Sequence, residues 1–255
     1  MRLAVVDVGS NAIRLLMVVL DKNGRQLEKK FQRYPLRLGK DVFSLGELSS
    51  STLDELFMVF DDISVRMNQF KPDKYRAVAT SAMRDAKNSK FITDTILNRS
   101  DIKLEVISGE DESIMVRDAL ARALKGKSNC ELYIDLGGGS LEIGQVESNC
   151  FSSLPLGTVR LLERYPDFSG RVSHDRVKQV TKEIIDELTA FSLQFSHSKV
   201  AVGTGGSLSV LANLANNSSK ESGFPAICTK QLPGILSTLA SLSFGQKQDI
   251  YSIRK

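Results

Sequence analysis

The chain has 255 residues, of which 42% are hydrophobic and 25% are charged, and its formal net charge is +4 at pH 7. This composition indicates a globular protein that buries a real core, in one large domain or two of ordinary size. The mildly basic balance is compatible with an anionic partner but does not require one.

Several protein classes are excluded by short features of the sequence. The three cysteines are far apart and odd in number, which argues against a disulfide framework and a structural zinc site. The N-terminus reaches Asp7 without the apolar core of a secretion signal. The apolar run Ile13–Leu20 is interrupted by Arg14 and is too short to span a bilayer. We therefore expect a cytoplasmic protein with neither a membrane nor a nucleic acid as partner.

The first half is expected to open with three meandering strands. Leu3–Asp7 is a continuous apolar run that ends at a carboxylate, and Ile13–Leu20 is a second such run. Arg25–Leu38 provides a third, more polar strand region. Between the last two, the segment DKNG at Asp21–Gly24 predicts a hairpin turn, because Asn and Gly accept positive φ values.

Helices and single strands then alternate up to residue 124. The stretch Leu48–Phe70 repeats apolar residues at spacings of three and four, after serines that can cap a helix. The elements expected after it are a strand at Tyr75–Ala79, a helix at Asn88–Ser100, a strand at Lys103–Ile107 and a helix at Ser108–Leu124. Acidic residues in the first turn of the last helix complement its dipole.

The polar segment Lys125–Asn129 predicts a boundary between two domains, 1–124 and 125–255. The second half then repeats the order of the first. Its expected elements are strands at Glu131–Asp135, Leu141–Val146 and Cys150–Leu154, helices at Thr158–Arg164 and Ser173–Phe195, and a strand, glycine turn and helix within Lys199–Ala215.

Two short segments echo each other. VVDVGSNAI at Val5–Ile13 aligns with YIDLGGGSL at Tyr133–Leu141 when Asp7 is placed on Asp135. The strand order around the two segments repeats as well. We therefore predict a duplicated α/β protein of two ribonuclease-H-like domains, each a mixed sheet led by a three-stranded meander with helices packed on it, and a cleft between them.

The two echoing turns are suited to binding phosphate. Residues without a Cβ leave backbone N–H groups accessible, and such nests bind phosphate oxygens. The aspartates Asp7 and Asp135 could hold Mg²⁺ or another divalent cation, because hard carboxylate oxygens suit these metals. A third turn, GTGGS at Gly203–Ser207, lies between a strand and a helix, where amides bind anions. The alternative is a set of plain turns with capping aspartates.

A family resemblance covers the chain from Leu3 to about Leu214. The segments DVGSNAIRLLM, LRLGKDV, VATSAMRDAKNS, VISGEDES, YIDLGGGSLEIG, LPLGTVRL and GTGGSLSVLA occur in this order. Together they resemble the exopolyphosphatase / guanosine pentaphosphate phosphohydrolase family of the actin-like ATPase superfamily. The resemblance implies two actin-like domains and Mg²⁺-dependent removal of the terminal phosphate of polyphosphate, or of the 5′ γ-phosphate of pppGpp in the stringent response. It also suggests a homodimer.

The resemblance also implies roles for single residues. Glu112 in SGEDES falls on the glutamate that positions or deprotonates the attacking water, and Glu142 is a second acidic candidate. Asp7 and Asp135 would bind the metal. The candidate phosphate-binding residues are Gly9, Ser10, Asn11, Arg14, Arg84, Gly137, Gly138, Gly139, Ser140, Gly205, Gly206 and Ser207.

Each charged candidate has a plainer interpretation. Glu112 could instead complement the dipole of its helix from the first turn. Without the resemblance, this structural role would be favoured over a catalytic one. Arg14 would be a solvated strand residue and Arg84 a surface charge. The basic stretch Arg25–Lys40 would be a solvated hairpin face, or it would guide a polyanion.

The chain also departs from the family pattern. Ala12 and Leu141 stand where the family often has a hydroxyl residue, and each removes one potential phosphate donor. Family members normally continue beyond the point reached by Lys255, so we expect an incomplete second half without the additional C-terminal helical domain.

Two other functions fit the same turns. An actin-like kinase or ATPase would use them for a nucleotide, with a purine pocket beside GTGGS. A non-catalytic sensor of polyphosphate or an alarmone would bind without turnover, although the presence of Glu112 argues against it.

Overall fold

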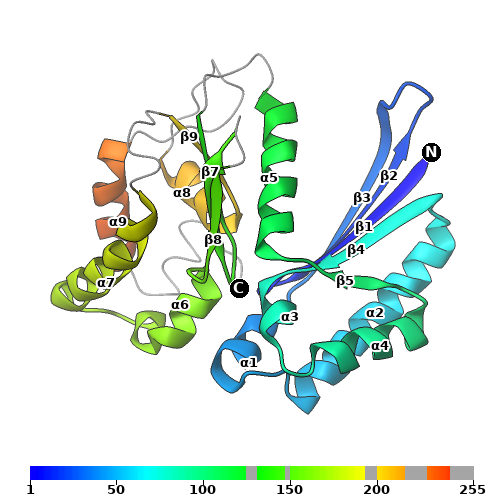
Figure 1. The fold of residues 1–255 in the computed structure, drawn as a ribbon, viewed down its shortest axis with the longest axis horizontal. Coiled ribbons are helices and arrows are strands. Elements are labelled where there is room, and N and C mark those ends of the chain that lie inside the picture. Colours follow the sequence, from blue (N-terminus) through cyan, green and yellow to red (C-terminus); the bar gives the residue numbers. More distant parts are fainter. Residues whose placement is uncertain (125–130, 147–149, 193–199, 216–228, 242–255) are drawn as a thin grey trace. The chain divides into compact units, whose positions relative to one another are not determined.

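The computed structural model describes residues 1–124, 131–146, 150–192, 200–215 and 229–241 (Figure 1). Contacts divide the chain into two compact units. The first unit consists of Met1–Glu112, Gly138–Ser140 and Pro155–Glu163, and the second of Ser113–Gly137, Leu141–Leu154 and Arg164–Lys255. The glycine turn at 138–140 and the segment 155–163 therefore fold with the first unit. The predicted boundary segment, Lys125–Asn129, lies outside the described residues.

The first unit contains a mixed five-stranded sheet in the order β3-β2-β1-β4-β5 (Figure 1). Its strands are β1 (Arg2–Val8), β2 (Ile13–Leu20), β3 (Gln26–Tyr34), β4 (Lys74–Ala79) and β5 (Leu104–Val106). The pairs β1–β2 and β2–β3 are antiparallel, whereas β1–β4 and β4–β5 are parallel. The predicted three-stranded meander that leads a mixed sheet is thus confirmed.

The predicted hairpin turn joins β2 to β3. Gly24 has a φ of 79°, and the Asp21 carboxylate accepts hydrogen bonds of 2.8 Å from the amides of Asn23 and Arg25. These bonds are the Asx-turn chemistry that makes such a tetrapeptide a turn.

Three predicted helices of the first half are present, with bounds within two residues of those expected: α2 (Ser50–Phe70), α4 (Ser89–Ser100) and α5 (Gly109–Leu124). The predicted serine cap of α2 is Ser49, whose hydroxyl accepts a hydrogen bond from the Thr52 amide.

The prediction of a strand over Arg25–Leu38 was wrong at its C-terminal end. Strand β3 ends at Tyr34, before Pro35, which has no N–H to donate to a ladder. Helix α1 (Leu38–Leu45) follows and ends at Gly46, which has a φ of 83° and donates its amide to the Val42 carbonyl. A second short helix that the sequence did not predict, α3 (Ser81–Asp85), follows β4.

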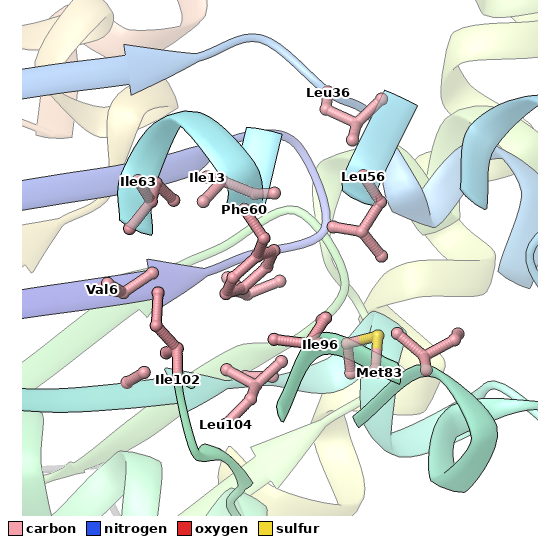
Figure 2. Packing of buried hydrophobic residues seen from close by; sticks show 14 of the residues in the cluster. Val6, Ile13, Leu36, Leu56, Phe60, Ile63, Met83, Ile96, Ile102 and Leu104 are labelled. Carbon is pink, nitrogen blue, oxygen red and sulfur yellow. The ribbon is translucent and has the colours of Figure 1, made fainter. Parts of the chain in front are cut away.

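The core of the first unit lies between one face of the sheet and the helices (Figure 2). Alternate residues of β1 point into it, as expected of a strand with one buried face. Helix α2 contributes the apolar stripe that its spacing predicted. Figure 2 labels ten members of this cluster: Val6, Ile13, Leu36, Leu56, Phe60, Ile63, Met83, Ile96, Ile102 and Leu104.

The second unit repeats the strand arrangement of the first in the order β8-β7-β6-β9. The strands are β6 (Leu132–Leu136), β7 (Leu141–Gln145), β8 (Phe151–Leu154) and β9 (Ala201–Thr204). The first three form an antiparallel meander, and β9 pairs with β6 in parallel, as β4 does with β1. The predicted internal duplication is therefore visible in the topology.

The helices of the second half begin with α6 (Thr158–Arg164), α7 (His174–Ser192) and α8 (Gly206–Leu214). The remaining helical segments are α9 (Leu232–Ser241) and two 3₁₀ turns, η1 (Pro166–Ser169) and η2 (Thr229–Gln231). The Ser173 hydroxyl accepts a hydrogen bond from the Arg176 amide and caps α7 as predicted. Among the described helices, none combines the length and apolarity needed to cross a membrane.

The burial of Phe60 in the core predicts that truncating this side chain destabilises the fold. Phe60 is 1% exposed, and truncating a buried Phe removes both its burial and its packing contacts. Phe60→Ala should therefore lower the free energy of unfolding by about 3–5 kcal/mol, measured by urea denaturation. Met58 on the same helix is 61% exposed, so Met58→Ala should stay within about 0.5 kcal/mol of wild type. Equal effects of the two substitutions would contradict this core.

Candidate active site

The first glycine turn joins β1 to β2 and belongs to the first unit. The Gly9 amide donates to the Ala12 carbonyl at 3.1 Å, and the Ser10 carbonyl accepts from the Gly39 amide of α1 at 2.9 Å. The Ser10 hydroxyl is buried and shares a hydrogen bond of 2.9 Å with the Ser81 hydroxyl of α3. Two short helices thus hold this turn, and the Ser10 side chain contacts protein.

The second glycine turn lies directly against the first within this unit. A Cβ atom added to Gly138 would lie 3.2 Å from the Cβ of Ser10 and 3.3 Å from that of Asn11. A Cβ atom added to Gly139 would lie only 2.0 Å from the Ser81 hydroxyl oxygen and 2.6 Å from that of Ser10. Any other residue at position 139 would therefore force the Ser81 and Ser10 side chains to move, and the two echoing turns lie side by side.

Segment 155–163 supports the second turn. The amides of Val159 and Arg160 in α6 both donate to the Gly138 carbonyl, at 2.7 and 3.1 Å. A Cβ atom on Gly157 would lie 2.3 Å from the backbone N and C of Gly139, so the two segments touch backbone to backbone. This close approach explains the glycine in LPLGTVRL.

Several amides of the two turns have no acceptor in the backbone. In the part of the chain that the structure describes, the amides of Ser10, Asn11 and Gly139 donate to no backbone carbonyl. Backbone N–H groups that are not used within the fold form anion-binding nests when they cluster. The paired turns therefore have the donor chemistry of a phosphate site.

An ion pair flanks the first turn. Arg14 Nη1 lies 2.6 Å from Asp7 Oδ2, and these residues face each other across β1 and β2. Their side chains are 44% and 35% exposed. Exposed pairs of this kind contribute at most about 1 kcal/mol, so both groups remain accessible to a charged ligand. Arg14 is accordingly a paired residue rather than an isolated solvated one.

Glu112 and Arg84 form a second, less exposed pair. Arg84 Nη1 lies 3.5 Å from Glu112 Oε2 and donates to the Ile107 carbonyl at 2.8 Å. Only 17% of the Glu112 side chain and 27% of the Arg84 side chain are exposed. Arg84 is therefore not a surface charge, and Glu112, although in the first turn of α5, also has a specific cationic partner.

The entry to α5 is fixed by reciprocal capping. The Ser108 hydroxyl accepts a hydrogen bond of 3.0 Å from the Asp111 amide and donates one of 2.7 Å to the Asp111 carboxylate. The Glu112 amide also donates to the Ser108 carbonyl. The SGEDES segment thus fixes the backbone from which Glu112 projects.

Asp135 and the third glycine turn lie in the second unit, as does Gly137. The Thr204 hydroxyl donates a hydrogen bond of 2.7 Å to Asp135 Oδ1. Gly205 has a φ of 98°, and a Cβ atom there would lie 2.3 Å from the Leu136 carbonyl oxygen. Thr204 orients the predicted metal ligand, a role that sequence reasoning missed although the residue lies inside GTGGS. Helix α8 begins at Gly206 and continues through Ser207.

Glu142 lies inside the second unit. Its side chain is fully buried on β7, opposite Asp135, and accepts a hydrogen bond of 2.8 Å from the Ser153 hydroxyl. The neighbouring Tyr133 is also buried, which raises the pKa of its hydroxyl. The predicted catalytic role of Glu142 stays a prediction, and the structure shows a carboxylate enclosed by protein.

The predicted metal ligands match one common mode of Mg²⁺ binding, in which the protein supplies only one or two carboxylates. Within the described residues, no group of three or more acidic, His or Cys side chains could hold a metal by itself. Mg²⁺, however, commonly binds one or two carboxylates and takes its other ligands from water and substrate phosphates. The accessible carboxylate of Asp7 suits that mode.

Comparison with known proteins identifies the family. A family model described as the Ppx/GppA phosphatase family matches residues 26–246. The chain belongs to the Ppx/GppA phosphatase family. Exopolyphosphatase 1 of Mycobacterium tuberculosis (strain H37Rv) is 33% identical over 171 residues, which are 66% of this chain and 50% of that protein. Exopolyphosphatase 1 of Mycobacterium leprae is 27% identical over 248 residues, 95% of this chain and 73% of that protein.

Solved structures of Ppx/GppA proteins share the fold. The crystal structure of the Aquifex aeolicus family member has a TM-score of 0.75 at 24% identity, and covers 100% of this chain and 84% of that one. An exopolyphosphatase from Cytophaga hutchinsonii has a TM-score of 0.83 at 20% identity, with the same coverage. The α/β fold of the Ppx/GppA family is therefore shown, whereas the chain spans about half the length of the curated relatives from M. tuberculosis and Mycobacterium bovis that it matches.

The backbone contact at Gly157 gives a test of the site's construction. Gly157→Ala should push the second turn away from α6 and lower the free energy of unfolding by about 1–3 kcal/mol, the usual range for overpacking. A Cβ atom on Gly170 would meet nothing within 4 Å, so Gly170→Ala serves as the control. Denaturant titration of both variants measures the difference, and a Gly157→Ala variant as stable as the control would refute the contact.

Proposed function

We propose that this Ppx/GppA chain is a Mg²⁺-dependent exophosphatase that removes the terminal phosphate of inorganic polyphosphate. The supporting observation is the juxtaposition of the two glycine turns, which both lie against Ser81 of α3. Helix α3 carries both Ser81, which contacts the turns, and Arg84, which contacts Glu112. The relatives that are named exopolyphosphatases support polyphosphate as the substrate. The terminal phosphoanhydride of pppGpp is proposed as a second substrate for the same donors.

Substrate binding would use the paired turns. The amides of Ser10, Asn11 and Gly139 donate to the equatorial oxygens of the terminal phosphoryl group, and the Asn11 amide side chain adds a further donor. Asp7 would hold Mg²⁺, which would supply positive charge to the phosphate oxygens when bound, and the metal-binding role of Asp135 stays a prediction from the sequence. Phosphoryl transfer depends on this positioning and charge neutralisation more than on covalent chemistry.

Hydrolysis would proceed by in-line attack of water. Glu112 orients the water and accepts its proton as the oxygen attacks the terminal phosphorus, and the bond from that phosphorus to the bridging oxygen breaks. The products are orthophosphate and a polyphosphate chain shorter by one unit. Arg84, whose Nη1 lies 3.5 Å from Glu112 Oε2, would help to orient this carboxylate toward the water.

The role of Glu112 can be tested by a conservative substitution. Glu112→Gln should reduce phosphate release from polyphosphate by a factor of about 10²–10⁴ while leaving polyphosphate binding intact. Glu110 lies in the same first turn of α5 and is exposed, so Glu110→Gln should retain wild-type activity. Turnover by Glu112→Gln at the wild-type rate would remove the assignment.

The same assay separates the alternative functions. Phosphate release from polyphosphate, pppGpp and ATP is compared side by side with wild-type protein. Preference for ATP would indicate an actin-like ATPase or kinase, and tight polyphosphate binding without turnover would indicate a sensor. Either result would replace the proposed function.

Metal dependence gives a separate prediction. EDTA should abolish phosphate release and added Mg²⁺ should restore it. Asp7→Asn should raise the Mg²⁺ concentration for half-maximal activity by at least about tenfold, since loss of even an outer-sphere group costs 10–100-fold in affinity. Asp94, which pairs with Lys90 on α4, provides the control Asp94→Asn. Full activity in EDTA, or an unchanged Mg²⁺ requirement in Asp7→Asn, would contradict the metal assignment.

A further inference from the structure

Arg160, in the LPLGTVRL segment, contacts three separate parts of the first unit. Its Nε donates a hydrogen bond of 2.8 Å to the Gly139 carbonyl. Its Nη2 pairs with Asp85 Oδ2 at 2.6 Å. The guanidinium carbon lies 3.9 Å from the centre of the Phe43 ring. One half-buried side chain thus joins the second glycine turn, helix α3 and helix α1.

These contacts need an arginine. A guanidinium group presents several donors in a fixed planar fork, and its flat face stacks on an aromatic ring. Lysine has a single ammonium group at the end of a flexible chain and cannot hold the carbonyl, the carboxylate and the ring with one geometry. The arrangement is therefore specific to the residue type and not only to its charge.

The hydrogen bond to Gly139 has a consequence for the neighbouring amide. In a trans peptide, the carbonyl and the following N–H point in opposite directions. Because Arg160 holds the Gly139 carbonyl, the Ser140 N–H points away from Arg160. Because the α6 amides hold the Gly138 carbonyl, the Gly139 N–H likewise points away from α6. Two consecutive amides are thereby turned to the same side, as an anion nest requires.

The pair with Asp85 connects this turn to the proposed water-activating group. Asp85 is the last residue of α3 and follows Arg84, which pairs with Glu112. The glycine turn, through Arg160, and Glu112, through Arg84, are therefore both linked to one helix of five residues. Ser81 at the other end of α3 contacts the first turn.

We propose that Arg160 is a positioning residue. It turns the Gly139 and Ser140 amides toward the terminal phosphate and keeps them at a fixed position relative to Glu112. This inference rests on the proposed function. It assigns Arg160 no contact with the substrate, because its guanidinium is occupied by Gly139, Asp85 and Phe43.

A matched pair of substitutions tests the proposal. Arg160→Lys keeps the charge but loses the fork, and should lower kcat/KM for polyphosphate by about 100-fold, the effect of displacing reacting groups by about 1 Å. Arg164 lies one turn later on α6 and pairs with Glu187 of α7 instead of a glycine turn. Arg164→Lys should therefore keep wild-type kcat and KM.

Separate measurements of tripolyphosphate affinity and of kcat distinguish a positioning role of Arg160 from a role in stability alone. In a Glu112→Gln background, calorimetry with tripolyphosphate should show affinity weakened about tenfold or more by Arg160→Lys and unchanged by Arg164→Lys. Asp85→Asn leaves the Gly139 contact in place, so it should lower kcat with little change in KM. If Arg160→Lys fails to fold, the Asp85→Asn variant tests the proposal by itself. Equal losses of kcat and of tripolyphosphate affinity in Asp85→Asn would overturn the proposal.

The failure of the inference differs from the failure of the proposed function. An active wild type in which Arg160→Lys matches Arg164→Lys in both kcat/KM and tripolyphosphate affinity would overturn the role of Arg160 alone. A wild type that neither hydrolyses polyphosphate nor binds tripolyphosphate would overturn the proposed function and this inference together.

Discussion

The close approach of two backbone turns is the constraint on which the site depends. At Gly139 the neighbouring serine hydroxyls leave no room for even a single carbon atom beyond the backbone. Protein interiors are packed densely enough that such a contact transmits any displacement. The first turn, the second turn and the start of α6 therefore form one packed cluster within the first unit, and the orientation of their peptide groups follows from that packing.

Two short helices hold this cluster together, and each does so with side chains that face different neighbours. Helix α3 uses Ser81 toward the glycine turns, Arg84 toward Glu112 and Asp85 toward Arg160. Helix α1 begins beside Ser10, and its Phe43 lies beside the Arg160 guanidinium. Hydrogen bonds to ionised groups are stronger than neutral ones, and burial increases the cost of leaving them unmade. The geometry of the site is thus fixed by a small polar network beside the apolar core.

Periodicity in the sequence predicted most of the fold, because β1 and α2 carry apolar residues at the spacings of a half-buried strand and helix. It missed α1 and α3, which are too short to show a helical repeat. At the site, the turns at Gly9 and Gly138 were recognised from the missing side chains. The sequence could not show that the Ser10 hydroxyl faces Ser81, that Thr204 holds Asp135 or that Arg160 contacts Gly139, because these partners are 71, 69 and 21 residues apart, respectively.

The duplicated topology carries opposite charges at one equivalent position. In the first sheet the residue paired with Asp7 is Arg14, and in the second sheet the residue paired with Asp135 is Glu142. The repeat has therefore preserved the scaffold while reversing the sign of a cross-strand neighbour. One copy pairs its aspartate with a cation, whereas the other places two acids opposite each other, and each of these acids accepts a hydrogen bond from a hydroxyl group. Equivalent aspartates of the two repeats therefore have different polar partners, the Arg14 guanidinium in the first sheet and the Thr204 hydroxyl in the second.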